Sequence, residues 1–313
     1  MKSYWRPIVQ TGASRPAEAL TLADGWAWFD RVEKIQRGGT REVVSLDQLP
    51  ETALDALTRA RRPVAGVTMS RPRIMGIVNV TPDSFSDGGQ FATSADASVF
   101  GKGMVDQGAD FLDVGGESTR PGAEVVGQEE EIARVQKVIT ELADLAPVSV
   151  DTRKSAVGRA ALDAGAVIIN DVSALEYDPD LGRVAAAENV PICLMHAQGV
   201  PETMQDDPRY EDVLLDVYDG LEDAIARAQS VGIQRDNIIV DPGIGFGKTL
   251  EHNLALLRDI SLFHGFGVPV LLGASRKRFI GSITGNGRSA KSGRFGCCCP
   301  NGDRARGSDC ARP

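Results

Sequence analysis

Short apolar runs alternate with amphipathic stretches from Arg73 onward. Each run is rich in β-branched residues and apolar throughout, which is typical of strands buried on both faces. The stretches between them, for example residues 129–146 and 155–166, repeat apolar side chains at the helical period. Seven strands are therefore predicted, at residues 73–80, 109–116, 147–151, 166–171, 191–196, 237–241 and 268–273.

Strands that alternate with helices indicate βαβ units and a parallel sheet. Seven units in succession favour a TIM-type (β/α)8 barrel over a doubly wound sheet, and a chain of 313 residues is long enough for one. The dinucleotide fingerprint G-x-G-x-x-G does not follow the first strand, which weakens the doubly wound alternative further. We predict an α/β barrel preceded by an N-terminal extension.

Polar side chains stand at or just beyond the carboxyl end of every predicted strand. In a barrel these ends converge on one face, and that face carries the active site. A single aspartate there is usually a helix cap or turn residue, but that explanation is harder to apply to seven strands. Acids and amides around an apolar mouth suit a ligand with many donors and acceptors, such as a heterocycle. The residues are Asn79, Asp113, Asp151, Asn170, His196, Asp241 and Ser275.

Three loops that follow these strands carry further chemistry. Residues 115–122 combine glycines with hydroxyls and Arg120. Residues 241–249 suggest a P-loop, but Pro242 stands where that motif needs its first glycine, so we reject a nucleoside triphosphate site. Lys277 lies at a predicted helix start, where a cation is unfavourable unless an anion or acceptor awaits it, so we expect it to be functional.

Composition excludes several classes of protein. The net charge of -9 gives no sign of a nucleic-acid surface. We expect no membrane span and a cytoplasmic location, because long apolar runs and an apolar secretory leader are both missing. Three scattered histidines give no zinc signature, and no Ser-His-Asp order or nucleophile elbow is present. We therefore expect positioning and electrostatics rather than covalent catalysis.

Six motifs, in this order along the chain, resemble dihydropteroate synthase of the folate pathway. The first two together are highly specific, because each spans about ten residues. The resemblance runs from about Arg73 to Gly285. The motifs read NVTPDSFSDGG, DVGGESTRPGA, SVDT, IINDV, DPGIGFGK and GASRKRFIG.

The resemblance implies roles for individual residues. Asp151, Asn170 and Asp241 would hydrogen-bond the edge of a pterin, with Lys277 closing over its ring; Thr119 would also contact the pterin. The expected catalytic residues are Lys277, Asp151 and Asp241. An aminobenzoate pocket, where sulfonamides compete in the family, would be formed by Thr119, Arg120, Pro121, Phe246 and Ser275.

The resemblance also implies a metal and a lid. Asn79 would ligate Mg²⁺ held mainly by the diphosphate of the substrate, in keeping with the few protein ligands this ion usually takes. The loop from Thr81 to Gly89 would be a mobile lid over the reacting centre.

The implied reaction joins 4-aminobenzoate to 6-hydroxymethyl-7,8-dihydropterin diphosphate and releases diphosphate. Two alternatives remain open. One is a pterin-binding methyltransferase acting on methyltetrahydrofolate, against which the loops 81–89 and 115–122 argue. The other is an inactive pterin-binding pseudoenzyme, which only the C-terminal segment supports.

Residues 286–313 do not read like the rest of the family. They are rich in glycine, arginine and cysteine, show neither a helical period nor a strand, and resemble GC-rich DNA translated in the wrong frame. Our hypothesis is a frameshift near residue 290, which re-sequencing would test. An eighth strand and the last helices would then be missing, so that strands one and seven keep open edges.

Three segments are thus expected: an N-terminal extension at 1–72, a pterin-binding barrel at 73–285 and an aberrant, disordered tail at 286–313. The extension is expected to form a small hairpin and helix that pack on the exterior or the base of the barrel. A homodimer is expected from the family but doubtful here, because its C-terminal helices are not recognisable. We expect weak activity or none from the chain as it stands.

Overall fold

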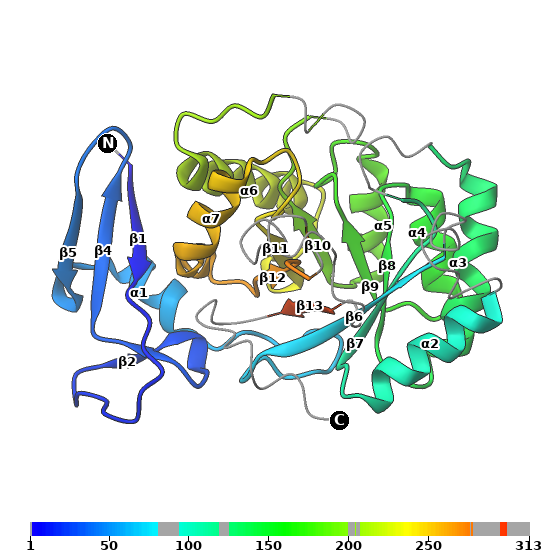
Figure 1. The fold of residues 1–313 in the computed structure, drawn as a ribbon, viewed down its shortest axis with the longest axis horizontal. Helices are drawn as coiled ribbons and strands as arrows, with labels where there is room; N and C mark the ends of the chain where they lie inside the picture. The colour runs from blue at the N-terminus through cyan, green and yellow to red at the C-terminus, as the bar shows by residue number, and fades with distance from the viewer. Residues whose placement is uncertain are drawn as a thin grey trace.

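Seven strands follow the seven predicted apolar runs, with slightly narrower bounds (Figure 1). The computed structural model describes residues 2–80, 94–118, 125–199, 204, 207–275, 277 and, for the backbone only, 295–298. The strands are β6 (Arg73–Asn79), β7 (Phe111–Gly115), β8 (Val148–Asp151), β9 (Ile168–Asp171), β10 (Ile192–Met195), β11 (Ile238–Asp241) and β12 (Leu271–Leu272).

The strands from β6 to β11 pair in chain order, and each pair is parallel. A parallel bridge between Val240 and Val270 adds β12 beside β11. Sequential parallel strands need a crossover between them, and helices provide it and cover the outer face of the sheet in Figure 1. This confirms the α/β barrel-type fold.

Six helices in the described part of the barrel cover the sheet. In α3, for example, Val135, Val138, Ile139 and Leu142 recur at helical spacing and are all fully buried. Side-chain caps fix the start of two others: Asp212 accepts from the backbone of α6, and Thr249 forms a capping box with His252 at α7. The helices are α2 (Ser94–Asp106), α3 (Gln128–Leu142), α4 (Ser155–Asp163), α5 (Asp180–Glu188), α6 (Val213–Ser230) and α7 (Leu250–Arg258), with 3-10 turns η4 (Arg235–Asn237) and η5 (Ile260–Phe266).

The eighth position in the sheet is taken by β13 (Phe295–Cys298), which runs antiparallel to both of its neighbours. Figure 1 shows it between β12 and β6. Two expectations were therefore wrong: the tail contains a strand, and the edges of β6 and β12 are not left open. The physical reason is that unpaired backbone groups on an edge accept any extended segment, whatever its side chains. The remaining tail residues lie outside the described part.

The N-terminal residues form a small unit with its own sheet and core. A three-stranded antiparallel sheet runs in the order β1-β4-β5, and β4 and β5 form the predicted hairpin. A separate apolar cluster lies beneath it and includes Leu22, Phe29, Val32 and Leu57, all fully buried. The elements are β1 (Ser3–Pro7), β2 (Leu20–Thr21), η1 (Leu22–Asp24), β3 (Trp28–Phe29), β4 (Arg31–Gln36), β5 (Arg41–Ser45), η2 (Leu46–Gln48) and α1 (Glu51–Thr58).

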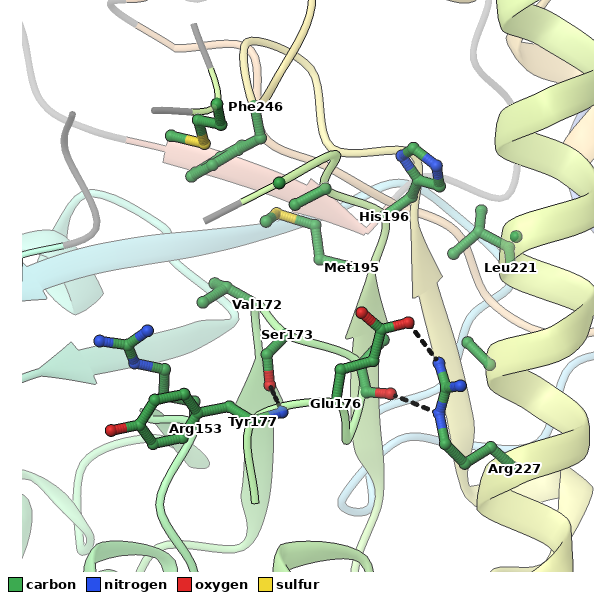
Figure 2. Close-up of a pocket in the computed structure, with 16 residues that line it drawn as sticks. Arg153, Val172, Ser173, Glu176, Tyr177, Met195, His196, Leu221, Arg227 and Phe246 are labelled. Atoms are coloured by element: carbon green, nitrogen blue, oxygen red, sulfur yellow. Dashed lines mark hydrogen bonds and ion pairs between the residues drawn. The ribbon is translucent and has the colours of Figure 1, made fainter. Parts of the chain in front are cut away.

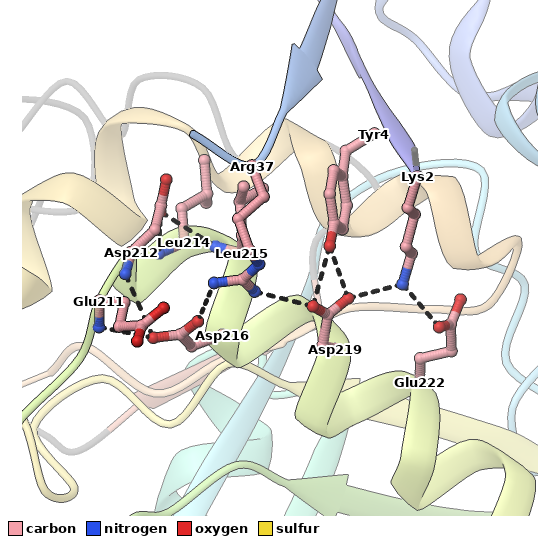
Figure 3. A network of polar contacts seen from close by, with 10 residues as sticks. All are labelled: Lys2, Tyr4, Arg37, Glu211, Asp212, Leu214, Leu215, Asp216, Asp219 and Glu222. Atoms are coloured by element: carbon pink, nitrogen blue, oxygen red, sulfur yellow. Dashed lines mark hydrogen bonds and ion pairs between the residues drawn. The ribbon is translucent and has the colours of Figure 1, made fainter. Parts of the chain in front are cut away.

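This unit docks on the outside of the barrel (Figure 1), where β1 and α1 lie against η5. Figure 3 shows the side chains of the unit that reach α6. Asp219 of α6 is the centre of the contact. Its carboxylate accepts hydrogen bonds from Tyr4 at 2.8 Å, from Lys2 at 2.5 Å and from Arg37 at 2.8 Å. Tyr4 also meets Tyr218 edge to face, with the ring centroids 5.3 Å apart. No described helix combines the length and the apolar composition needed to cross a lipid bilayer.

Candidate active site

Four neighbouring strands end in one aligned row of residues. The sheet register pairs Asn79 with Gly115, Gly115 with Asp151, and Asp151 with Asn170. These positions therefore lie side by side at the carboxyl end of the sheet. Three of the four are predicted site residues, and parallel pairing alone is enough to bring them together.

Gly115 leaves an open space between two of these side chains. A Cβ on Gly115 would lie 3.4 Å from Oδ2 of Asp151 and 3.6 Å from Oδ1 of Asn79. A carboxylate oxygen and an amide oxygen thus border the same space. Burial raises the pKa of Asp151 well above its ordinary value, and the neighbouring carboxylates Asp113 and Glu131 add to the effect.

Asp113 lies deeper than the sequence pattern suggests. It sits in the middle of β7 and is buried, and its Oδ2 accepts a hydrogen bond from Nδ2 of Asn170 at 3.0 Å. Burial raises the pKa of Asp113, while hydrogen bonding opposes the shift. This bond uses one amide hydrogen of Asn170 and fixes the orientation of its amide plane. Asp113 therefore positions the Asn170 side chain.

Asp241, at the end of β11, and Lys277, after β12, lie near one another at Gly273. A Cβ on Gly273 would lie 3.7 Å from Oδ2 of Asp241 and 3.8 Å from Nζ of Lys277, so both groups border the same point. The other carboxylate oxygen of Asp241 accepts the Gly243 backbone N–H at 2.7 Å. Burial raises the pKa of Asp241, and the nearby Lys277 cation opposes that rise.

Lys277 is held over an aromatic ring. Its Nζ lies 4.4 Å from the centroid of the Phe246 ring and donates to the carbonyl of Ile244. Gly245 has φ +83, and a Cβ there would come within 3.0 Å of the Lys277 side chain, so glycine is required. Burial lowers the pKa of Lys277 to about 8, against the attraction of Asp241.

The structure adds a buried pair that sequence reasoning missed. Nζ of Lys248 lies 3.2 Å from Nδ1 of His196 and donates to the carbonyls of His196 and Phe246 at 3.1 and 2.9 Å. Burial lowers the pKa of Lys248 to about 7 and that of His196 to about 3. Lys248 thus ties the end of β10 to the loop that carries Phe246. The available signal was its place in the glycine-rich loop 241–249, two residues after Phe246.

A cavity of about 370 Å³ opens beside this group (Figure 2). Val172, Met195 and Phe246 form part of its wall, and α6 forms another part through Leu221. Arg153 lies at its rim, with its guanidinium 4.1 Å from the centroid of the Tyr177 ring. Among the predicted site residues that the structure describes, only His196 and Phe246 line this cavity, so it does not contain the polar row of Asp151 and Asn170.

Several predicted residues fall beyond this description. Thr119, Arg120 and Pro121 lie outside the described residues, as does the loop from Thr81 to Gly89. Ser275 is described and follows β12, as Lys277 does. The structure therefore brings together Asn79, Asp151 and Asn170 in one group, and Asp241, Phe246 and Lys277 in another.

Known proteins of one family are similar to most of the barrel. The sequence profile described as "Pterin binding enzyme" matches residues 75–305, which extends past Gly285 into the C-terminal segment. The chain belongs to the pterin-binding enzyme family. It is 46% identical over 232 residues to the dihydropteroate synthase of Escherichia coli (strain K12), which covers 73% of this chain and 82% of that protein.

Solved structures of dihydropteroate synthases share its fold. That of Xanthomonas albilineans with 4-aminobenzoic acid has a TM-score of 0.65 at 48% identity, covering 71% of this chain and 80% of its own. The structure of the same enzyme in complex with 7,8-dihydropteroate has a TM-score of 0.62 at 45% identity, and the match covers 70% of this chain and 78% of that one. The structure of the Yersinia pestis enzyme with a sulfonamide drug has a TM-score of 0.68 at 43% identity, and the match covers 72% of this chain and 82% of that one. This pterin-binding family member is thus similar to enzymes that carry both halves of the expected product.

Proposed function

We propose that the chain condenses 4-aminobenzoate with (7,8-dihydropterin-6-yl)methyl diphosphate to give 7,8-dihydropteroate and diphosphate. The single observation that carries the proposal is the gathering of these polar side chains at the carboxyl ends of the parallel strands. The side chains are Asp151 and Asn170, which are neighbours in the sheet, and Asp241 with Lys277, which lie near one another at Gly273. Similarity to dihydropteroate synthases with bound 4-aminobenzoic acid and 7,8-dihydropteroate supports it.

The carboxylates and the amide suit the edge of a pterin. That edge presents an amino group, ring N–H groups and a carbonyl in sequence, and it needs both acceptors and a donor. Asp151 and Asp241 supply acceptors. Asn170 supplies an acceptor and a donor, and its hydrogen bond to Asp113 fixes the orientation of its amide group. Their burial makes each such bond stronger than it would be in water.

Lys277 and Phe246 form the wall between the two substrates. The Lys277 ammonium can cover the pterin ring from the side of Asp241, and Phe246 presents an apolar face to the arylamine. We assign the rest of the aminobenzoate pocket to Thr119, Arg120, Pro121 and Ser275, as the family resemblance implies. Sulfonamides are expected to compete there, since the Yersinia pestis relative has been solved with one.

Asn79 fits the role of a magnesium ligand. The space beside Gly115 is bordered by oxygen atoms of Asn79 and Asp151, and oxygen is the donor that Mg²⁺ prefers. Within the described residues no cluster of three or more acidic, histidine or cysteine side chains forms a complete site. The ion would therefore take most of its ligands from the substrate and water, and when bound it would stabilise charge on the leaving diphosphate.

The chain's own part in the reaction is to bind, align and shield. The arylamine nitrogen forms a bond to the pterin methylene carbon while the bond from that carbon to the diphosphate oxygen breaks. The nitrogen then gives up one proton, and the released diphosphate carries the electron pair of the broken bond. No side chain has to act as nucleophile, so holding the two substrates in line is the main contribution. Excluding water prevents hydrolysis of the developing cation.

Product formation tests the proposal. Purified chain with Mg²⁺, the pterin diphosphate and 4-aminobenzoate should form dihydropteroate, more slowly than the Escherichia coli relative if residues 286–313 lack cationic help for the leaving group. Binding of the pterin diphosphate with no turnover would indicate a pseudoenzyme. Methyl transfer from methyltetrahydrofolate with no dihydropteroate formed would indicate the methyltransferase instead.

Two further expectations concern location and assembly, and only the second comes from the family resemblance. We infer a cytoplasmic location and a homodimeric assembly. Cell fractionation and sedimentation of the purified chain test them, and a monomer at micromolar concentration would contradict the second.

A further inference from the structure

The loop between β11 and α7, residues 242–249, passes very close to the end of β10. Gly243 has φ +66, and a Cβ there would lie 1.9 Å from the carbonyl oxygen of His196, so the two backbones leave no room for a side chain. Lys248 lies near the other end of the loop and is almost fully buried. Its ammonium donates to the carbonyl of His196 at 3.1 Å and to that of Phe246 at 2.9 Å. One side chain therefore links the loop to the residue that follows β10.

The same loop supplies both groups that hold Lys277. Phe246 provides the ring that the Lys277 ammonium contacts, and Ile244 provides the carbonyl that accepts its hydrogen bond. Phe246 also lines the cavity of Figure 2, together with His196. A shift of the loop away from β10 would therefore displace an aromatic wall and the acceptor of Lys277 in one movement.

We propose that Lys248 is a positioning residue for the arylamine substrate, acting through the loop 242–249 on Phe246. The inference rests on the proposed function, which assigns Phe246 to the wall that faces the arylamine. Lys248 holds the carbonyl of Phe246 at a fixed distance from the end of β10, and that strand is itself paired with β9 and β11. The Phe246 ring, attached to the same backbone, is thereby fixed relative to the sheet.

Other bonds hold the loop on the side away from β10. Asn253 of α7 is buried, and its Oδ1 accepts the N–H of Gly245 at 2.6 Å. Tyr210 donates its hydroxyl hydrogen to the carbonyl of Gly247 at 2.9 Å. These bonds do not involve the Lys248 side chain. Replacing that side chain should therefore leave the loop folded and remove its link to β10.

The link does not depend on the charge of Lys248. Burial lowers the pKa of Lys248 to about 7, so the neutral amine is also present near neutral pH. The amine still has two hydrogens for the two carbonyls. His196, whose Nδ1 lies 3.2 Å from Nζ, can donate to the lone pair in the tautomer that carries its proton on Nδ1. Both forms of Lys248 therefore hold the loop, as a positioning role requires.

The test separates the two substrates. Lys248→Met keeps the length of the side chain but removes the hydrogens that bind the two carbonyls. The dissociation constant for 4-aminobenzoate, titrated into protein saturated with oxidised 6-hydroxymethylpterin and diphosphate, should rise about tenfold, because small misplacements of contact residues are costly. The dissociation constant for the pterin diphosphate alone should rise less than about threefold, since Asp151 and Asn170 belong to β8 and β9.

A double-mutant cycle shows whether Lys248 acts through Phe246. Phe246→Ala by itself should weaken aminobenzoate binding. Adding Lys248→Met to Phe246→Ala should then cause less than about twofold further loss, because the effects of residues that act through one another do not add. A general loss of order would weaken binding by the same factor in both backgrounds, and that result overturns the positioning role.

Arg61→Met is the matched control. Arg61 is another buried cation that donates to carbonyls, those of Arg59 at 2.7 Å, Ala56 at 2.8 Å and His264 at 3.1 Å, but it follows α1 in the N-terminal unit. Its replacement should cost stability without changing the affinity for either substrate. If Lys248→Met does not fold, Lys248→Arg takes its place. Arginine keeps the charge and the donors but is longer, so it should push the loop away from β10 and give the same selective loss.

Each outcome decides between the proposals. Unchanged aminobenzoate affinity in the folded Lys248 variant, or equal losses for both substrates, overturns the positioning role. An equal loss of aminobenzoate affinity in Arg61→Met overturns it as well, because the effect would then follow stability. A wild-type chain that binds neither substrate and forms no product contradicts the proposed function instead.

Discussion

The ammonium of Lys277 lies 4.4 Å from the centre of the Phe246 ring, although 31 residues separate them in the chain. The loop after β11 supplies the ring and the segment after β12 supplies the cation, so adjacent strand positions bring them together. Lys277 is also attracted by Asp241. The protonation state of Lys277 therefore depends both on its burial and on the charge of Asp241.

Catalytic efficiency should fall on the alkaline side of about pH 8. Burial lowers the pKa of Lys277 to about 8 from its ordinary 10.5, so the cation is present below pH 8 and is lost as the pH rises through that value. Only the cation attracts the Phe246 ring face. The measurement is kcat/KM for the pterin diphosphate against pH.

Lys277→Arg is the control for this titration. Arginine keeps its charge over the whole range, so the alkaline limb should disappear even if the maximum rate is lower. A limb that persists near pH 8 in this variant would belong to another group, such as Lys248.

Removing the charge of Asp241 should weaken pterin binding. Asp241→Asn replaces one acceptor oxygen by a donor, and a hydrogen bond to a charged group contributes about 1.5–3 kcal/mol, which corresponds to roughly 10- to 150-fold in the dissociation constant. Calorimetry with the pterin diphosphate measures it. Asp236→Asn is the matched control because Asp236 is exposed just before β11. Equal affinity in the two variants would contradict the pterin contact.

The sequence predicts the part of the fold that depends on regular patterns. Buried parallel strands read as apolar runs, and the register of parallel pairing then aligns Asn79, Asp151 and Asn170 without further information. Asp241 and Lys277 follow from the same logic at β11 and β12. The contact between Asn170 and Asp113 could not be predicted, because it depends on which way each side chain turns within the barrel.

Two features lay beyond sequence reasoning for physical reasons. Among the described residues Lys248 bonds to two carbonyl groups, which every residue carries, so its place in a glycine-rich loop did not reveal its partners. The pairing of β13 likewise uses backbone groups alone, so an unusual composition did not exclude a strand there.

Lys248 should make the stability of the protein depend on pH. Burial lowers its pKa to about 7 from 10.5, so between these values the unfolded chain binds more protons and the free energy of unfolding rises with pH. The slope contributed by one such group approaches about 1.4 kcal/mol per pH unit. Urea unfolding from pH 6.5 to 9 measures it. Lys248→Met should flatten the curve, and an unchanged slope would contradict the buried cation.

Asp219 should hold the N-terminal unit to the barrel. Asp219→Ala removes the shared acceptor of Lys2, Tyr4 and Arg37, and the expected loss of unfolding free energy is about 1–2 kcal/mol, since the site is partly open to solvent. Thermal unfolding measures the loss, and limited proteolysis should then release the unit sooner. Asp223→Ala, one turn further along α6 and exposed, should behave like wild type.

Deleting residues 286–313 should destabilise the barrel rather than leave it unchanged. The backbone of β13 pairs with Arg73 to Gly76 on one side and with Leu271 and Leu272 on the other. Without it, both strands present unpaired backbone groups, which invite edge-to-edge association. Light scattering on heating and hydrogen exchange of the β6 amides measure the two effects. Deleting only residues 301–313 keeps β13 and is the matched control. Equal exchange and equal aggregation in the two truncated chains would show that β13 adds nothing to the sheet and that the tail behaves as the composition of residues 286–313 first indicated.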